Sequence, residues 1–401
     1  MTSAVPVPAA AAPWLDAWLH RHEADVVAWR RHLHSRPELG FDEHETTTFL
    51  AGELAAAGLV PTVLPGGTGL LCDVGSGERT VALRADIDAL PLDDVKDVPY
   101  RSTVPGVCHA CGHDAHTAVL LGVARALATA PPLPGRVRLV FQPAEESLPG
   151  GALAAIAGGA LAGVSRIFAL HCDPRLDRGR VGLRSGPITA ACDMVEVRVS
   201  GPGGHTARPH LTVDVVDALG RLITEVPGLL SHRADPRHVV SLVWGAVEAG
   251  TAPNAIPGHG VLRGTVRMQG REAWHGAEGV VSGLIADVVR PTGASVDVRY
   301  VQGVPPLVND GTAVEVLREA VVEGLGPAAA AVAEQSLGGE DFAWYTETVP
   351  GALARLGVRP PGTSGAPRDL HQPDFDIDEA ALAVGVRLLV HTALAALARP
   401  S

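Results

Sequence analysis

The hydrophobic pattern of the first part of the chain alternates between short strand-like runs and longer stretches with helical spacing. Residues 26–59 show a helical pattern that breaks at Pro37 and resumes near Glu43, and residues 116–129 place Leu and Val at helical spacing. Runs typical of strands cover residues 69–76, 80–91, 136–146 and 165–173. Strands that alternate with helices in this way predict a three-layer α/β domain with a mostly parallel central sheet.

The pattern changes in the middle of the chain. There the order is strand, helix, strand, strand, helix, strand, which is the signature of a ferredoxin-like α+β unit. These elements are expected at residues 193–201, 212–226, 238–250, 259–269, 271–289 and 295–303. A helical pattern of the first kind returns at 311–326. We therefore expect a discontinuous α/β domain, residues 1–187 and 305–401, that is interrupted by a small domain at 188–304.

Composition and charge exclude several classes of protein. Of the 401 residues, 46% are hydrophobic and 19% are charged, which is typical of a globular protein. The formal net charge is −12 and no run of Lys or Arg occurs, so nucleic acid is not an expected partner. The N-terminus lacks the basic start and apolar core of a signal peptide. The uncharged stretch 148–165 is rich in Ala and Gly, and we expect a helix packed on the sheet there rather than a membrane span. These features predict a cytoplasmic protein with no membrane partner.

The five cysteines do not predict a disulfide framework, because their number is odd and no secretion signal is found. Cys108 and Cys111 form a C-x-x-C pair, which raises the alternative of a redox protein. The histidines around this pair do not belong to a redox motif, so the redox interpretation is disfavoured. The other three cysteines are expected to be ordinary buried thiols.

Side chains of the types that bind metals follow several of the predicted strands. Loops at the carboxyl ends of strands in an α/β sheet converge on one crevice, so residues there are expected to lie close together. A single His is more often structural than a ligand, but the joint placement of these residues predicts a site. The residues are Asp86, Asp88, Cys111, His113, His116, Glu145, Glu146 and His171, with His371 late in the chain.

Motifs along nearly the whole chain resemble the metal-dependent amidohydrolases that include aminoacylase, carboxypeptidase G, hippurate hydrolase and the plant enzymes that hydrolyse indole-acetyl–amino acid conjugates. The resemblance is strongest to the hippurate and indole-acetyl branch, which more often has Met where this chain has Cys108. It does not extend to residues 1–25 or 395–401. The motifs that carry it include RRHLHSRPELGFDEHET, LRADIDALP, HACGHDAHTAVLLGVA, FQPAEE, LHCDP, GPGGHTARPH, TAPNAIP, GGEDFAWY and LHQPDFDID.

This resemblance implies two divalent metal ions per chain, with zinc or manganese expected and cobalt or nickel as alternatives. The matching ligands are Cys111, His113, Glu146, His171 and His371. The number of donors agrees, because a structural zinc takes four ligands and a single catalytic zinc takes three plus water. Five donors instead suit two ions that share a bridging group. Thiolate, imidazole and carboxylate donors accept all four metals.

The resemblance also assigns roles to residues outside the ligand set. Glu145 matches the general base, which takes a proton from the attacking water and passes it to the departing amine. Asp86 and Asp88 are expected to accept hydrogen bonds from metal-bound imidazoles, and His109 and His116 are candidates for similar roles. No chemistry is assigned to His32 or His34. Three residues of the small domain match the family's binding groups for the oxyanion and the substrate carboxylate: His205, Asn254 and Arg267.

The function that the resemblance implies is hydrolysis of N-acyl amino acids to a carboxylic acid and a free amino acid. The domain at 1–187 and 305–401 then holds the metals and the catalytic group, and 188–304 is a lid and dimerisation domain. A homodimer is expected in which His205 serves the active site of the partner. The alternatives are a dipeptidase or carboxypeptidase-like activity on the same scaffold, and a metal-binding homologue without catalysis, which would not need Glu145.

Overall fold

The computed structural model describes residues 13–366 and 368–399, and these form two compact units. The first unit consists of Met1–Gly186, Asn309–Glu334 and Trp344–Ser401, and the second of Pro187–Val308 and Gln335–Ala343. The short return segment Gln335–Ala343 is held in the second unit by backbone hydrogen bonds. Ser336 N–H donates to the carbonyl of Ile188 at 2.9 Å, and Ala190 N–H donates to that of Gly338 at 3.1 Å.

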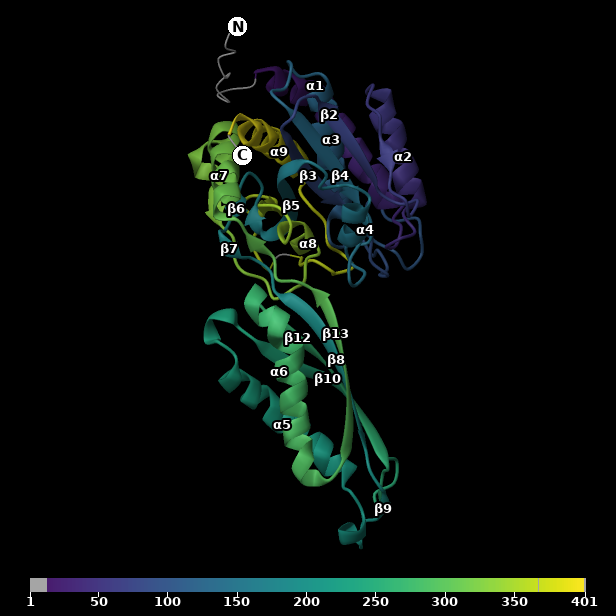
Figure 1. The fold of residues 1–401 in the computed structure, drawn as a ribbon. Helices are drawn as coiled ribbons and strands as arrows, with labels where there is room; N and C mark the ends of the chain where they lie inside the picture. The colour runs from purple at the N-terminus through teal and green to yellow at the C-terminus, as the bar shows by residue number, and fades with distance from the viewer. Residues whose placement is uncertain (1–12, 367, 400–401) are drawn as a thin grey trace. The chain divides into compact units, whose positions relative to one another are not determined.

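An eight-stranded sheet forms the centre of the first unit, in the order β1-β2-β4-β3-β5-β16-β6-β15 (Figure 1). The four strands β4, β3, β5 and β16 run parallel to one another, so the centre of the sheet is parallel as predicted. Every residue of β3 is buried, as expected for a strand covered on both faces. The strands are β1 Thr62–Val63, β2 Leu70–Gly75, β3 Thr80–Asp86, β4 Arg136–Gln142, β5 Val164–Asp177, β6 Val181–Leu183, β15 Ala330–Val332 and β16 Gly351–Arg359.

Helices α3 and α9 pack on the central strands of this sheet, α1 packs on both of them, and α7 packs on α9. The break predicted at Pro37 is present, because α1 ends at Ser35 and α2 begins at His44. The first helix starts well before the predicted residue 26. The helices are α1 Pro13–Ser35, α2 His44–Ala56, α3 His113–Ala128, α4 Ala152–Ala157, α7 Gly311–Leu325, α8 Ala343–Thr346 and α9 Ala381–Ala398.

The glycine-rich stretch 148–165 does not form the long helix that its composition suggested. Only Ala152–Ala157 is helical, and it lies next to β4. Gly159 and Gly163 have φ values of +96° and +72°, which no α-helix accepts, so the helix ends there. Among the described helices, α9 has the length and composition of a membrane span, but 72% of that segment is buried within the protein, as in a core helix.

The second unit has the predicted ferredoxin-like fold. Its antiparallel sheet has the order β10-β12-β8-β13, and helices α5 and α6 pack on each other and on this sheet (Figure 1). Buried and more exposed residues alternate along β8, so one face of the strand points to the helices. The elements are β8 Ala191–Ser200, α5 Val215–Arg233, β10 Ser241–Ala249, β12 His259–Met268, α6 Arg271–Val289 and β13 Ser295–Val304.

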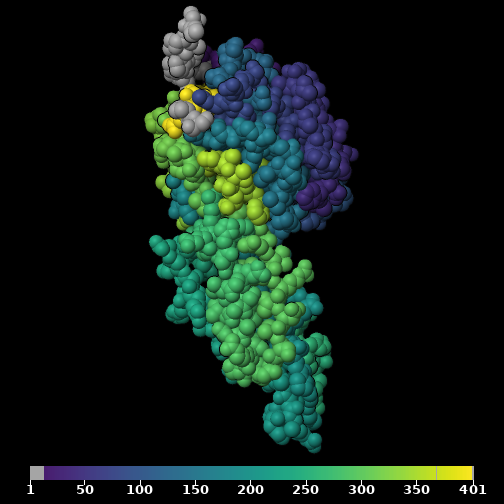
Figure 2. Space-filling view, viewed as in Figure 1, coloured from purple at the N-terminus to yellow at the C-terminus, as the bar shows by residue number. Residues whose placement is uncertain are grey.

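A small two-stranded ribbon projects from one end of this unit. It pairs β9 (Gly204–His205) with β11 (Ala255–Ile256), and residues 202–211 around β9 are exposed. In the space-filling view, the rest of the second unit does not cover this end (Figure 2). Two further short strands, β7 (Gly186–Pro187) and β14 (Val308–Asn309), lie where the chain passes from one unit to the other.

Candidate metal centre

The predicted ligands of the first unit converge where its parallel strands end. Cys111 lies two residues before His113, the first residue of α3, and His171 lies on β5. Glu146 follows β4 in the chain. Gly112, between the first two ligands, has a φ of +88°, and an added Cβ there would lie 3.0 Å from the Cys172 sulfur. Only glycine fits this turn, which lets Cys111 and His113 face the same site.

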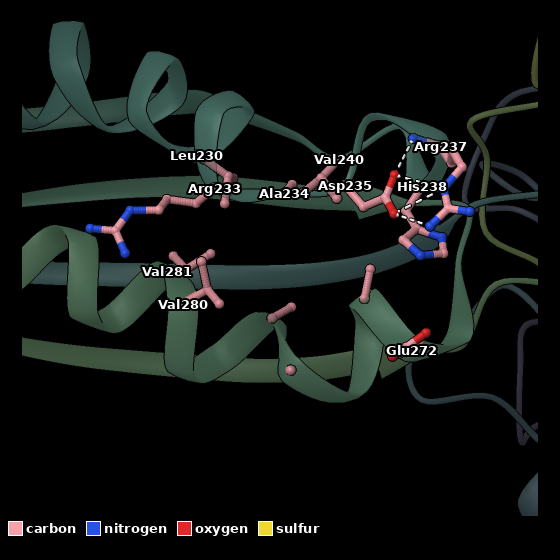
Figure 3. Close-up of a pocket in the computed structure, with 13 residues that line it drawn as sticks. Leu230, Arg233, Ala234, Asp235, Arg237, His238, Val240, Glu272, Val280 and Val281 are labelled. Atoms are coloured by element: carbon pink, nitrogen blue, oxygen red, sulfur yellow. Dashed lines mark hydrogen bonds and ion pairs between the residues drawn. The ribbon is translucent and has the colours of Figure 1, made fainter.

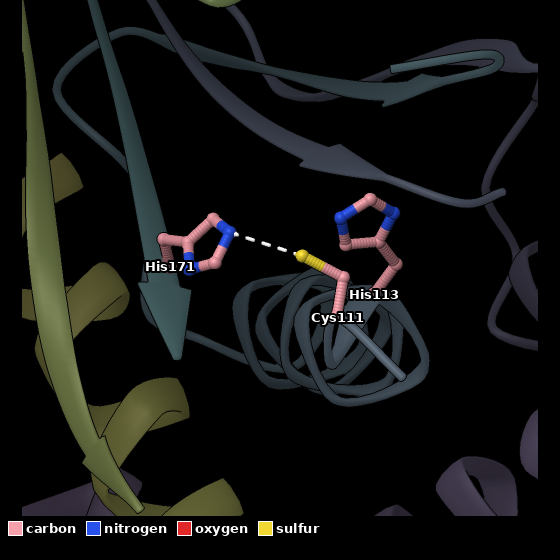
Figure 4. A group of neighbouring side chains, drawn as sticks. All are labelled: Cys111, His113 and His171. Carbon is pink, nitrogen blue, oxygen red and sulfur yellow. Dashed lines mark hydrogen bonds between the residues drawn. The ribbon is translucent and has the colours of Figure 1, made fainter. Parts of the chain in front are cut away.

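The sulfur of Cys111 belongs to two groups of ligand atoms. In one group it lies with His113 and His171, and in the other with Glu146 and His371, with all atoms of a group within 4.8 Å of one another. The distance from Cys111 Sγ to His171 Nε2 is 3.5 Å (Figure 4). In this view the rings of His113 and His171 stand on either side of the sulfur. The structure therefore brings together all five predicted ligands around one shared sulfur atom.

Hydrogen bonds on the far side of the imidazole rings fix which nitrogen faces the site. His113 Nδ1 lies 3.0 Å from the Asp88 carbonyl and 3.2 Å from its carboxylate, so it carries the proton. His171 Nδ1 donates to the carbonyl of Cys172 at 2.8 Å. In both neutral rings, the lone pair is left on Nε2, the nitrogen that faces the cluster. This is the arrangement that metal-binding histidines require.

The cluster is suited to cations rather than to internal hydrogen bonding. His113 is 1% exposed and its Nε2 atom has no hydrogen-bond partner among the described residues. Burial raises the pKa of the Cys111 thiol well above its usual value, so its thiolate needs a nearby positive charge. Glu146 Oε1 lies 3.2 Å from His371 Nε2 and 4.0 Å from His113 Nε2. A thiolate, three imidazoles and a carboxylate in this arrangement fit borderline-soft divalent cations.

Glu145 lies at the edge of the same cluster. One of its carboxylate oxygens falls within 4.8 Å of ligand atoms of His113 and Glu146. The backbone N–H of Glu146 donates to Asp88 Oδ2 at 2.9 Å, so Asp88 holds both this loop and His113. Asp88 thus contacts an imidazole in the way expected from the sequence. The site therefore has two adjacent carboxylates. Glu146 contacts both His113 and His371, and Glu145 lies beside this group.

His116 and Asp86 form a second layer beneath the ligands. His116 Nδ1 donates to Asp86 Oδ1 at 2.6 Å, and its Nε2 accepts from the backbone N–H of Cys172 at 2.8 Å. Arg84 binds the other Asp86 oxygen at 2.7 Å. These contacts hold the part of β5 that carries His171. The similar role expected for His109 has no counterpart, because neither of its ring nitrogens has a hydrogen-bond partner among the described residues.

His34, to which no chemistry was assigned, is completely buried beside the site. Asp114, which follows His113, accepts from Arg30 Nε at 2.6 Å and lies 2.7 Å from His34 Nδ1. Burial alone would raise the pKa of Asp114, but Arg30 and His34 hold that pKa well below its usual value. The contact ties α1 to the start of α3. The signal in the sequence was the spacing of Arg30 and His34, four residues apart on one helical face.

The three predicted binding residues of the second unit do not all lie together. His205 and Asn254 are neighbours on the projecting ribbon, where Thr206 N–H donates to the Asn254 carbonyl at 3.2 Å. His205 Nδ1 accepts from Ala207 N–H at 3.0 Å, which leaves the proton of a neutral ring on Nε2. Arg267 lies near the other end of β12, which starts at His259. Eight strand residues at about 3.3 Å each separate these ends by roughly 26 Å.

A pocket of 320 Å³ in the second unit lies between α5 and α6 and carries none of the predicted residues (Figure 3). Its charged rim includes Arg237, which is already paired with Asp235 at 2.5 Å. Apolar side chains such as Leu230 and Val281 line its interior. Its titratable lining residues include Asp235, His238 and Glu272, but none of the five predicted metal ligands lines it.

Comparison with known proteins identifies the family of the chain. The family model for peptidase family M20/M25/M40 matches residues 82–395. A protein of Rhodococcus jostii (strain RHA1) named as a glutamate–cysteine ligase is 51% identical over 93% of this chain, and the chain spans 47% of that protein. The N-acetyl-L-cysteine deacetylase of Bacillus subtilis (strain 168) is 37% identical, over 90% of this chain and 85% of the relative.

A solved structure supports the same assignment. A dinuclear metal-binding peptidase of the M20 family from Bacillus subtilis superposes with a TM-score of 0.81 at 33% identity, covering 94% of this chain and 98% of the other. The resemblance and the fold class predicted from the sequence are thereby confirmed. The chain belongs to peptidase family M20/M25/M40.

Proposed function

We propose that this protein is a metal-dependent amidohydrolase that cleaves N-acyl amino acids to a carboxylic acid and a free amino acid. The observation that carries the proposal is the placement of Glu145 beside a cluster in which one sulfur joins two groups of metal-binding atoms. A protein that only binds metal has no need for a second carboxylate at this point. Family membership and the deacetylase relative support the same reaction class.

In this proposal five residues hold two divalent ions, zinc or manganese first, with cobalt and nickel as alternatives. Cys111 would contribute to holding both ions, because its sulfur lies in both groups of ligand atoms. The ions supply a water of lowered pKa and polarise the amide carbonyl. The remaining ligands are His113, Glu146, His171 and His371.

Glu145 acts as the general base and then as the general acid. Its carboxylate takes the proton of the attacking water and delivers it to the nitrogen of the departing amine. Both glutamates lie in the turn that follows β4. Glu146 Oε1 approaches His113 Nε2 and His371 Nε2, whereas the carboxylate of Glu145 lies at the edge of the cluster. Two neighbouring glutamates can therefore have separate roles.

Residues of the second unit are proposed to bind the substrate. Arg267 offers a guanidinium for the α-carboxylate, which it can bind with two hydrogen bonds. His205 offers an Nε2–H donor for the negative charge that develops on the carbonyl oxygen, and Asn254 adds an amide beside it. The N-acetyl-L-cysteine deacetylase relative suggests N-acyl cysteines as the first substrates to test.

The first test is a substrate panel. Metal-reconstituted protein is expected to hydrolyse N-acyl amino acids, while their methyl esters lose about 100-fold in kcat/KM, because the donors that face the carboxylate stay unpaired. The panel includes N-acetylcysteine, hippurate and simple dipeptides, and chelator-treated protein is the control. Equal rates of hydrolysis of acids and their methyl esters would show that the protein has no binding site for the α-carboxylate. Hydrolysis of dipeptides alone would favour the peptidase alternative.

We further propose a homodimer in which His205 and Asn254 serve the partner's substrate. The separation of roughly 26 Å along β12 means that one chain cannot bring His205 and Arg267 to the same small molecule. Two copies can do so. Strand β10 is an edge of its sheet and exposes Val243 and Val247, at 62% and 54%, which makes it a candidate for pairing with a second copy.

Complementation tests the dimer. Glu145→Gln protein and His205→Ala protein, each nearly inactive, are mixed under conditions that exchange subunits. We expect about a quarter of wild-type activity, because half of the dimers are hybrids and each hybrid has one complete site. His205 as an oxyanion donor is worth about 3–4 kcal/mol of transition-state stabilisation, so the signal is large. Hybrids that form but stay inactive would show that His205 acts in its own chain.

A cytoplasmic location is proposed on the basis of the cysteines. All five are free thiols in the structure. Free thiols persist in reducing compartments, and the proposed ligand Cys111 needs its thiol unoxidised.

A further inference from the structure

The backbone directly before Glu145 has a conformation that side chains disfavour. Ala144 has a φ of +54°. In this left-handed region the Cβ atom crowds the following carbonyl, so residues other than glycine seldom occupy it. Among the described residues, four that are not glycine have a positive φ: Phe41, Ala144, Val239 and His371. Ala144 precedes the proposed general base, and such strain persists where surrounding contacts impose it.

A hydrogen bond to Glu43 holds Ala144 in this left-handed conformation. The backbone N–H of Ala144 donates to Glu43 Oε1 at 2.7 Å, between residues 101 positions apart in the chain. Glu43 is 0% exposed and stands at the N-cap of α2, but its side chain makes no capping bond to that helix. Glu38 supplies that function, accepting from Glu45 N–H at 2.9 Å and Thr46 N–H at 2.7 Å. The buried carboxyl of Glu43 is therefore directed to the loop of the site.

The same loop is fixed on the other side of Glu145. Glu146 N–H donates to Asp88 Oδ2 at 2.9 Å. Gly151 N–H donates to the Ala144 carbonyl at 2.9 Å, which closes the loop after the two glutamates. Glu145 is thus the residue between two anchored amides. The dihedral angles of Ala144 contribute to the direction of the Cα–Cβ bond of Glu145, and Asp88 holds the peptide that follows.

We propose that Glu43 is a positioning residue that holds Ala144 in the left-handed conformation and thereby directs Glu145 at the reacting water. This inference rests on the proposed function, because it assumes that Glu145 is the general base. Glu43 contacts neither the ligands nor the substrate in this assignment. It acts through the Ala144 N–H.

Two substitutions at Glu43 separate the hydrogen bond from the volume of the side chain. Glu43→Met keeps the length and removes the acceptor. Glu43→Gln keeps an acceptor oxygen, and burial raises the pKa of Glu43 to about 7, so a neutral group is a close replacement. We expect Glu43→Met to lower kcat by about 10- to 100-fold, with KM and bound metal unchanged, because a small misplacement of a catalytic group has an effect of this size. Glu43→Gln should stay within about threefold of wild type.

Glu38→Ala is the matched control, because it removes a carboxylate from the same segment that caps α2 and does not reach the loop. It should lower Tm and leave kcat of the folded protein unchanged. A Glu43→Met protein that loses Tm but not kcat, that loses metal instead of kcat, or that fails to fold would overturn the inference. A Glu43→Gln protein as impaired as Glu43→Met would also overturn it.

Ala144→Gly tests the conformational part directly. Glycine adopts the left-handed region freely, so Gly at position 144 needs no contact to keep it there. In the Glu43→Met background this change should restore kcat by at least about threefold, whereas in the wild type it should change kcat by less than that. The same effect in both backgrounds would show that Glu43 and Ala144 act independently. If the wild-type protein neither binds metal nor hydrolyses the substrate, the proposed function and this inference are both wrong. If the wild-type protein is active and Glu43→Met has the same kcat, only the inference is wrong.

Discussion

Glu145→Gln is expected to keep both metal ions and to lose most of its turnover. Gln has nearly the same shape as Glu, but its amide cannot take a proton from water or return one to the departing amine. Removal of a general base typically lowers kcat by about 10²- to 10⁴-fold. The measurement is kcat on an accepted N-acyl amino acid, with bound metal determined on the same sample.

The neighbouring substitution, Glu146→Gln, provides the contrast. Glu146 Oε1 approaches the Nε2 atoms of His113 and His371, so its loss should lower metal occupancy first and activity as a consequence. Adding excess metal should recover part of the activity of Glu146→Gln and none of that of Glu145→Gln. If the two variants have the same metal content, the division of roles between these glutamates is wrong.

Cys111→Ser is expected to weaken the binding of both ions, because this sulfur lies in both groups of ligand atoms. A serine hydroxyl is a poor replacement for a thiolate that contributes to holding two borderline-soft cations. Loss of an outer contact to a metal ligand already costs about 10- to 100-fold in affinity, so loss of this ligand should exceed 100-fold. Metal affinity and kcat are both measured.

Cys108→Ala is the matched control for that experiment. Cys108 is also fully buried and lies three residues earlier, but its sulfur faces Lys96 Nζ at 3.8 Å. Its removal leaves a small cavity that costs about 1 kcal/mol of stability. Metal binding and turnover should stay nearly intact. The opposite ranking of the two variants would mean that the ligand has been assigned to the wrong cysteine, and would reopen the redox alternative if activity then needed no metal.

The elements and the convergence of the candidate ligands were predictable from local patterns in the sequence. Residues 271–289 were predicted as a helix and form α6 with these bounds, since apolar side chains recur there at helical spacing. The convergence of the candidate ligands was predictable in part because Glu146 follows β4 and His171 lies on the neighbouring part of the same parallel sheet, whose strand ends meet at one edge. The one long helix that failed, at 148–165, failed because glycines with positive φ end it at Ala157.

Contacts between distant segments could not be read from the sequence. Glu43 meets Ala144 across 101 positions, and Arg30 meets Asp114 across 84. The residues of each pair are too far apart in the sequence for hydrophobic periodicity or motif spacing to connect them. The segment Gln335–Ala343 joins the second unit through backbone hydrogen bonds and through side-chain hydrogen bonds from Gln335 and Arg267, between residues far apart in the chain. The separation of Arg267 from Asn254 depends on the path of β12 and likewise needed the structure.

The proposed function is hydrolysis by Glu145 with two metal ions held at the Cys111 cluster. Its most direct test is a titration of metal-free protein with zinc or manganese, in which bound metal and hydrolysis of an N-acyl amino acid are measured on the same samples. We predict two ions per chain at saturation and full activity only when both are bound. Full activity at one ion per chain, or in the absence of metal, would contradict the account.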